Sequence, residues 1–137
     1  GCIRKGGTSP IQEVIAYAER PRRRGLVLMD GPGNDVESVS GLLASGATLI
    51  LFTTGRGTPT GAPVAPVVKI ATNTPIAERM ADNTDFNAGV IADGTATLDE
   101  AAERLWELLL AVASGRLTRS EVLGHREFAI RRIAWTL

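Results

Sequence analysis

The segment from Gly25 to Pro59 most strongly constrains the fold of this chain. It contains two short apolar runs, Leu26–Met29 and Leu49–Phe52, and a polar turn with glycines follows each run. A helix-length segment, Asp35–Ser45, lies between them and ends at Gly46. Strand, turn, helix and strand in this order are typical of a right-handed βαβ unit. We therefore expect both turns to lie side by side at the carboxyl edge of one parallel sheet, where open α/β sheets bind ligands.

The two turns supply the side chains of a candidate ligand site. In the second turn Arg56 stands between two glycines, which let the backbone approach a bound group closely. A guanidinium pairs with a carboxylate, and hydroxyls and amides suit a polyhydroxy compound. The sequence thus predicts a small, anionic, oxygen-rich ligand bound by Asp30, Asn34, Asp35, Thr53, Thr54, Arg56 and Thr58. The alternative is that these residues only cap turns and helix ends, and spacing alone does not separate the two interpretations.

Neither turn matches a known nucleotide-binding motif. The first turn resembles a dinucleotide fingerprint, but Val36 stands at the third glycine position and Pro32 interrupts the motif. No acidic residue follows the second apolar run to hold a ribose. The second turn has no Lys-Ser or Lys-Thr pair after its glycines, which excludes a P-loop.

Composition excludes several classes of protein. The 15 basic residues balance the 15 acidic ones, so no net field favours nucleic acid or a membrane surface as a partner. We interpret the basic run Arg20–Arg24 as a solvated connector close to the end of a helix. The single cysteine excludes an internal disulfide, and no apolar stretch reaches the ~20 residues of a membrane span. With 137 residues we expect one α/β domain, covering residues 1–137.

Capping signals predict the helices. Ser9-Pro10 starts one that Pro21 ends, and Asn34 with Glu37 forms a capping box for the next. Capping boxes at Thr97 and Thr118 open two more helices, and the first of these ends before Gly115. A short helix is also expected from Thr74-Pro75 to about Met80.

Apolar runs predict buried strands at 26–29, 49–53 and 67–71, and Val90–Ala92 is expected to form a last short strand. The proline-rich segment 58–66 cannot form a regular helix, so the strand at 67–71 is either antiparallel or reached by an irregular crossover. The tail, residues 127–137, is expected to pack as an arm against the body or against another domain. The predicted fold is a three-layer, Rossmann-like α/β domain with a short, mainly parallel sheet and helices on both faces.

Residues for metal binding or nucleophilic catalysis are few. His125 is the only histidine, and its place favours a surface position at a helix end. Cys2 could be reactive or a ligand. Asp82, Asp85 and Asp93 could serve a hard metal ion, although aspartates are common in turns. The sequence yields no complete set of metal ligands.

Several motifs together resemble one known family. The segments GLVLMDGPGNDVESVSGL, LILFTTGRGTPTGAPVAPVVKIATNT and DFNAG are similar to the carboxyl-terminal part of the altronate dehydratase / galactarate dehydratase family. The resemblance extends from the Lys5-Gly6-Gly7 loop to the region of Gly124, His125 and Glu127, and TTGRGTP followed by G, P, K and N is its specific part. The first eight residues resemble the middle of a longer protein, so we expect a fragment.

The resemblance implies a cytoplasmic lyase that removes water from a hexonate or hexarate and depends on iron(II) or manganese. It adds Lys69 to the expected substrate-binding residues and, with Asp30, Asp35 and Cys2, to the few candidate bases. The general base and most metal ligands are expected in upstream domains of the same chain, and a homo-oligomer is left open. Related members act on sulfonated hydroxy acids, so the substrate is open. The competing interpretation is a non-catalytic ligand-binding or assembly module.

Overall fold

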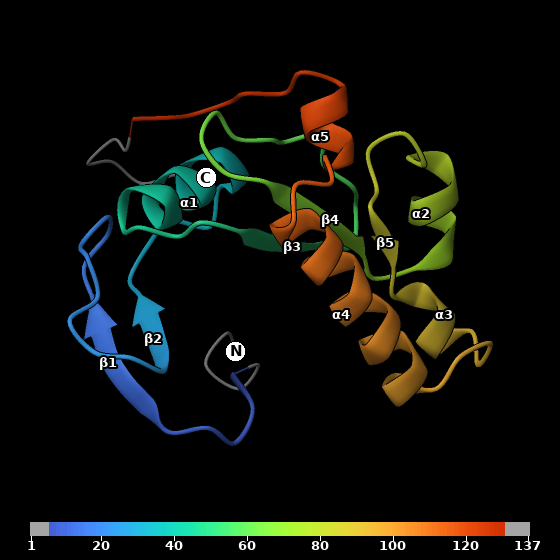
Figure 1. Ribbon diagram of the computed structural model, residues 1–137, viewed down its shortest axis with the longest axis horizontal. Helices are drawn as coiled ribbons and strands as arrows, with labels where there is room; N and C mark the ends of the chain where they lie inside the picture. Colours follow the sequence, from blue (N-terminus) through green and yellow to red (C-terminus); the bar gives the residue numbers. More distant parts are fainter. Residues whose placement is uncertain (1–5, 131–137) are drawn as a thin grey trace. The chain divides into compact units, whose positions relative to one another are not determined.

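The computed structural model describes residues 6–130, which divide into two compact units. Unit 1 contains residues 6–47 with 129–130, and unit 2 contains residues 48–128. Each unit has its own parallel sheet, with two strands in unit 1 and three in unit 2 (Figure 1). The predicted α/β class with parallel strands is confirmed. The single-domain organisation stays a prediction.

Unit 1 is built from strand β1 (Ile11–Ile15), strand β2 (Leu26–Met29) and helix α1 (Asp35–Ala44). The helix predicted from Ser9 is wrong, because Ile11–Ile15 pairs in parallel with β2. Three of these five residues are β-branched, and β-branched side chains favour a strand once a partner strand is available. The basic segment therefore joins two strands, and the carboxylate of Glu13 accepts hydrogen bonds from the backbone N–H groups of Arg22 and Arg23 at 2.8 and 3.0 Å.

Helix α1 packs on Tyr17. The phenol donates a hydrogen bond of 2.6 Å to the carbonyl of Glu37, and the ring lies so close to Gly41 that an added Cβ would overlap it. The helix ends as expected before Gly46, which has a φ of 103°. The predicted capping box is wrong: Asn34 occupies the N-cap position, but its side chain makes no capping hydrogen bond.

Unit 2 contains three parallel strands in the order β3 (Ile50–Thr54), β4 (Val67–Ala71) and β5 (Phe86–Asn87). The open question about residues 67–71 is thus answered: the strand is parallel to β3, and the proline-rich segment forms an irregular crossover. Every residue of β4 is buried, whereas β3 is an edge strand in which Leu51 is 46% exposed. The expectation of full burial is confirmed for 67–71 and wrong for 26–29 and 49–53, because β4 alone among the described strands has a strand on both sides.

Helix α4 (Leu98–Ala113) covers one face of the unit 2 sheet (Figure 1). Val68 and Ile70 project from β4 onto Val112, and the partly buried Leu105, Leu108 and Leu109 pack around them. Both halves of the predicted capping box at Thr97 are present, and Gly115 follows the helix with a φ of 104°. Because side chains alternate along a strand, Val67, Lys69 and Ala71 point to the opposite face of the sheet.

Three short helices complete unit 2: α2 (Thr74–Arg79), α3 (Gly89–Ala92) and α5 (Arg119–Val122). Helices α2 and α5 confirm the predictions at Thr74 and Thr118. The strand predicted at Val90–Ala92 is wrong, since these residues form α3 and the strand is the preceding Phe86–Asn87. A run of three apolar residues is too short for its periodicity to separate helix from strand.

The tail prediction is tested only up to residue 130. The backbone N–H of Ala129 donates a 2.9 Å hydrogen bond to Ser40 Oγ, and both residues belong to unit 1. Residues 131–137 lie outside the described part. Among the described helices, none is both long and apolar enough to cross a membrane.

Candidate functional site

The carboxyl ends of β3, β4 and β5 form one edge of the unit 2 sheet, because the three strands are parallel. Arg56 and Thr58 follow β3, Thr72 and Asn73 follow β4, and β5 ends in the polar Asn87. This is the edge at which open α/β sheets bind ligands. We refer to it as the carboxyl edge.

The turn after β3 is held from within and from β4. Thr54 Oγ1 accepts a 3.0 Å hydrogen bond from the N–H of Gly57, and Asn73 Nδ2 donates one of 3.0 Å to the carbonyl of Gly55. Gly57 has a φ of 84°, which favours glycine, and a Cβ there would also displace the side chain of Met80. The turn therefore presents Arg56 in a defined backbone position.

Arg56 in this turn and Thr53 near the end of β3 are free to meet a ligand. Both are exposed, and the Arg56 guanidinium makes no hydrogen bond or ion pair with any residue of unit 2, residues 48–128. A guanidinium offers five N–H donors in a planar fork that fits a carboxylate. An unpaired arginine at the carboxyl edge can therefore bind an anion.

Asn87 and Thr74 connect β5 to the start of α2. Asn87 Nδ2 donates to Thr74 Oγ1 at 3.0 Å, and Asn87 Oδ1 accepts from the N–H of Gly89 at 2.8 Å. The Thr74 hydroxyl in turn donates to the carboxylate of Asp93. A Cβ on Gly89 would overlap the backbone of Asn73 and Thr74. These side chains fix the backbone of the edge, and their polar atoms are already engaged.

A buried polar cluster lies on the face of the sheet to which Lys69 points. Lys69 is only 1% exposed, and its Nζ donates a 3.3 Å hydrogen bond to the carbonyl of Thr60. Thr58 and Thr60 are also buried, and their hydroxyls are 2.9 Å apart. Burial lowers the pKa of Lys69, and the negative charges of Asp85, Glu127 and Glu121 oppose that shift.

Asp85 ties this cluster to α5. One carboxylate oxygen accepts from the N–H of Lys69 at 2.7 Å, and the other accepts from the N–H of Arg119 at 2.7 Å. The buried Ser120 adds a contact from its hydroxyl to the carbonyl of Val67 at 3.4 Å. A carboxylate that holds two backbone amides has a structural role, which disfavours Asp85 as a metal ligand.

Glu127 and His125 close the cluster from the segment after α5. Glu127 Oε2 accepts a 2.9 Å hydrogen bond from the N–H of Gly61, and Oε1 lies 2.9 Å from His125 Nδ1. Partial burial raises the pKa of Glu127, but the hydrogen bonds from Gly61 and His125 outweigh that effect and leave the pKa lowered. A Cβ on Gly61 would overlap the carbonyl of His125, so the two segments are in close contact. His125 follows α5 as expected, and its ring is engaged by the hydrogen bond between Nδ1 and the Glu127 carboxylate.

The structure divides the predicted site residues between the two units. Thr53, Thr54, Arg56, Thr58 and Lys69 belong to unit 2, and Asp30, Asn34 and Asp35 belong to unit 1. The expectation that both turns lie at one edge of one sheet is wrong, because β2 pairs with β1 and β3 pairs with β4. Within unit 2 the carboxyl edge presents Thr53 and Arg56, whereas Thr58 and Lys69 are buried. The part of these residues in substrate binding stays a prediction.

The described residues contain no group of three or more His, Cys, Asp or Glu side chains that could hold a metal ion. Asp93 is bound to Thr74 and Asp85 to two backbone amides. Cys2 lies outside the described residues. We therefore assign no metal ligand to the described part of the chain.

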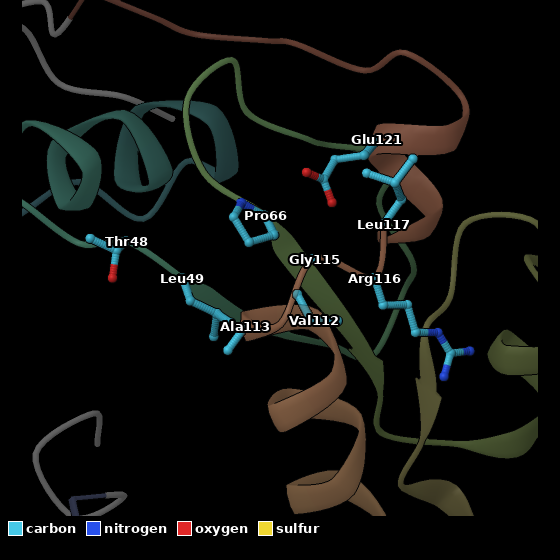
Figure 2. A pocket seen from close by; sticks show the side chains of 9 residues that line it. All are labelled: Thr48, Leu49, Pro66, Val112, Ala113, Gly115, Arg116, Leu117 and Glu121. Atoms are coloured by element: carbon cyan, nitrogen blue, oxygen red, sulfur yellow. The ribbon is translucent and has the colours of Figure 1, made fainter.

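A groove of about 370 Å³ lies at the opposite edge of the unit 2 sheet. Figure 2 shows that Thr48, Leu49 and Pro66, which precede β3 and β4, line it together with the end of α4, Leu117 and Glu121. Its position at the amino ends of the strands separates it from the carboxyl edge. Arg116 also lines it and is exposed, so it offers a matched comparison for Arg56.

Sequence reasoning missed the contacts of Gly61, Asp85 and Glu127 because their partners lie 16 to 66 residues away along the chain. The sequence nevertheless drew attention to some of these residues. The motifs that carried the family resemblance include Asn87, Gly61 and the region of His125 and Glu127.

Comparison with known proteins identifies relatives of the whole chain. Over 137 residues it is 41% identical to altronate dehydratase of Bacillus subtilis and covers 27% of that protein. It is 43% identical over 132 residues to galactarate dehydratase (L-threo-forming) of Escherichia coli, which is 95% of this chain and 25% of that protein. It is also 36% identical over 134 residues, 97% of the chain, to the (2R)-sulfolactate sulfo-lyase subunit beta of Chromohalobacter salexigens and covers 34% of that subunit.

The chain thus spans about a quarter to a third of the length of these curated relatives. The family model for the C-terminal part of D-galactarate/altronate dehydratase matches residues 1–136. The resemblance first seen in the TTGRGTP turn therefore extends over the whole chain, and the chain belongs to the D-galactarate/altronate dehydratase C-terminal family.

Proposed function

We propose that this chain is the carboxyl-terminal part of a hydro-lyase that dehydrates a hexonate or hexarate sugar acid to a 2-keto-3-deoxy acid. The observation that carries the proposal is the exposed Arg56 at the carboxyl edge of unit 2, whose guanidinium has no partner among residues 48–128. The names of the relatives, altronate dehydratase and galactarate dehydratase, support the reaction class. A sugar acid supplies both a carboxylate for Arg56 and hydroxyls for groups such as Thr53.

The reaction removes the proton next to the carboxylate and expels the hydroxyl on the neighbouring carbon. Two electrons of the C–H bond form the C=C bond of an enol while the C–O bond breaks, and the enol tautomerises to the 2-keto acid. Arg56 binds the carboxylate and counters the negative charge that develops on it when the proton leaves. Thr53 can donate a hydrogen bond to a substrate hydroxyl and so orient it.

A divalent metal such as iron(II) or manganese would supply a Lewis acid for the departing hydroxide. The described residues do not fit that role, because no cluster of potential ligands is present among them. We therefore derive no step through a metal in this part of the chain, and we propose that the ligands and the general base come from the rest of the enzyme.

The similarity to a sulfo-lyase subunit favours a second candidate. Its substrate is named as sulfolactate, which also combines anionic groups with a hydroxyl. The same edge could bind the carboxylate of such a substrate while sulfite, rather than water, leaves. A non-catalytic module is the third interpretation, and it predicts no turnover of either class of substrate.

The test is an assay of the full-length enzyme with altronate, galactarate and (2R)-sulfolactate, beside a truncated protein of residues 1–137. We expect the full-length enzyme to dehydrate a sugar acid and the truncated protein to be inactive. Turnover by the truncated protein would contradict the assignment of the base to the rest of the enzyme. Release of sulfite without dehydration of either sugar acid would favour the second candidate.

Arg56→Lys tests the role of the carboxyl edge. Lysine keeps the charge but not the planar fork, so kcat/KM should fall. The lost transition-state stabilisation should be on the order of 2 kcal/mol, within the range for hydrogen bonds to charged groups. Unfolding should be unchanged because the side chain is exposed. Arg116→Lys, at the groove of the opposite edge, is the matched control and should leave kcat/KM unchanged. If the two substitutions change kcat/KM equally, Arg56 does not bind the substrate.

A further inference from the structure

The carbonyl of Thr60 and the N–H of Gly61 belong to the same peptide group, and oppositely charged side chains bind its two ends. Lys69 Nζ donates to the carbonyl oxygen at 3.3 Å, and Glu127 Oε2 accepts from the N–H at 2.9 Å. A cation at the carbonyl and an anion at the N–H both match the direction of the peptide dipole. The two side chains come from β4 and from the segment after α5.

We propose that Lys69, Glu127 and His125 are positioning residues which, by clamping the peptide group between Thr60 and Gly61, hold the Arg56 turn in the geometry that binds the substrate carboxylate. This inference rests on the proposed function, because it assigns a role in that site. We call the three side chains and the peptide group the clamp.

The clamp lies a short way along the chain from the turn that it holds. Three residues separate Thr60 from Arg56, and one of them, Thr58, is buried with its hydroxyl 2.9 Å from that of Thr60. The N–H of Thr60 also points to Thr58 Oγ1 at 3.4 Å. A shift of the clamped peptide group therefore has a direct route to the Arg56 turn.

The hydrogen bond to His125 orients the Glu127 carboxylate towards the N–H of Gly61. Glu127 Oε1 lies 2.9 Å from His125 Nδ1, and the side chains are 39% and 29% exposed, respectively. Gly61 has no space for a Cβ because the carbonyl of His125 lies against it. Close packing and a charge-assisted hydrogen bond thus act on the same peptide group.

The side chain of Lys69 is buried, which is unfavourable for a charged group unless that group has a specific role. An ammonium in the interior loses its hydration, and among the described residues Lys69 Nζ donates only one hydrogen bond in return, to the carbonyl of Thr60. An apolar side chain would fill the same space without that loss. Such an arrangement indicates a residue kept for positioning rather than for stability alone.

The experiment uses the full-length enzyme and three variants: Glu127→Ala, Glu127→Gln and the control Glu107→Gln on the exposed side of α4. It measures kcat and KM for the sugar acid that the wild-type enzyme accepts, and hydrogen exchange in the peptide that covers residues 55–63. Glu127→Ala removes the acceptor of the Gly61 N–H, whereas glutamine keeps an acceptor without the charge.

We expect Glu127→Ala to raise KM at least tenfold, the equivalent of a lost charge-assisted hydrogen bond. Exchange in residues 55–63 should become faster while exchange in α4 stays the same. Glu127→Gln should recover most of the affinity, and Glu107→Gln should match the wild type. A change in kcat with unchanged KM and unchanged exchange would overturn the proposal.

Lys69→Met and the double variant Lys69→Met/Glu127→Ala test whether the two side chains act on one group. If they do, the double variant loses little more affinity than the worse single variant, because residues of one network are not additive. Independent, additive losses would overturn the clamp. If Lys69→Met fails to fold, the exchange and KM values of the Glu127 variants decide.

A failure of the clamp can be distinguished from a failure of the proposed function. If the wild-type enzyme turns over no sugar acid, the proposed function fails, and the exchange in residues 55–63 still tests whether Glu127 holds the loop. If the wild type is active but Glu127→Ala has a wild-type KM and wild-type exchange, only the clamp fails.

Discussion

The sheets of unit 1 and unit 2 are both parallel, yet only one of them has a fully buried strand. In unit 1, β2 has the burial expected of an edge strand and β1 buries only Ile15, whereas every residue of β4 in unit 2 is buried. The segments Leu26–Met29 and Val67–Ala71 are similar in length, and both are apolar except for Lys69. The difference comes from their neighbours, because β4 has strands on both sides and α4 on one face. Burial is therefore a property of the sheet order and not of the apolar run.

Ile70→Ala against Val14→Ala should give the largest contrast between the two sheets. Ile70 is 5% exposed in the core under α4, so its truncation should cost about 2–5 kcal/mol, as is typical for a buried aliphatic side chain. Val14 in β1 is 69% exposed, so its loss should change stability by no more than ~0.5 kcal/mol. Hydrogen exchange of the β4 and β1 amides in the full-length protein measures the loss of stability in each variant. A comparable loss at Val14 would show that the β1–β2 sheet is covered in the full-length protein.

Gly61→Ala against Gly33→Ala is expected to give the next contrast. In unit 2 a Cβ on Gly61 would overlap the backbone carbonyl of His125, which can yield only if the segment after α5 moves. Overpacking of this kind typically costs about 1–3 kcal/mol. In unit 1 no atom lies within 4 Å of a Cβ on Gly33. Thermal unfolding should thus show a lower Tm for Gly61→Ala but not for Gly33→Ala. Equal Tm values of the two variants would mean that the His125 segment does not pack against Gly61.

Thr97→Ala against Asn34→Ala compares the two helix starts. Thr97 accepts a hydrogen bond from the N–H of Glu100, so alanine should cost ~1 kcal/mol. Asn34 makes no capping hydrogen bond, so alanine at this position should change stability by a few tenths of a kcal/mol. Urea denaturation measures both. If Asn34 binds substrate as the sequence predicts, Asn34→Ala should still raise KM while stability stays the same, and an unchanged KM would leave Asn34 as a turn residue.

These contrasts also show what the sequence could and could not predict. Helix starts at Thr97 and Thr118 were predicted correctly because a capping box is local, with both partners within four residues. Ser9-Pro10 carries the same kind of local signal, but pairing of Ile11–Ile15 with β2 prevails over it. The candidate turn around Arg56 was found because its glycines, Gly55 and Gly57, lie within three residues of sequence. The clamp was not found because it joins Gly61, Lys69 and Glu127, whose contact in space depends on the sheet order.

The smallest effect is expected from the charge of Lys69, and it depends on pH. Burial lowers the pKa of Lys69 below its usual 10.5. Between the folded pKa and 10.5 the unfolded chain binds more protons than the folded chain, so the free energy of unfolding rises with pH in this window. At lower pH Lys69 is charged in both states, and its burial then lowers stability. Lys69→Met removes this dependence, so the stability of the wild type relative to the variant should increase as the pH rises towards 10.5.

Urea denaturation of the wild type and Lys69→Met, in steps from neutral pH to just above 10.5, measures that difference. Arg24→Met, an exposed cation of unit 1, is the control, and its difference from the wild type should not vary with pH because arginine stays charged throughout. A wild type that loses stability relative to Lys69→Met over the same window would mean that the folded protein raises the pKa of Lys69. The carboxylates of Asp85, Glu121 and Glu127 would then prevail over burial, and the clamp would be a net stabilising ion network instead of a buried charge held for positioning.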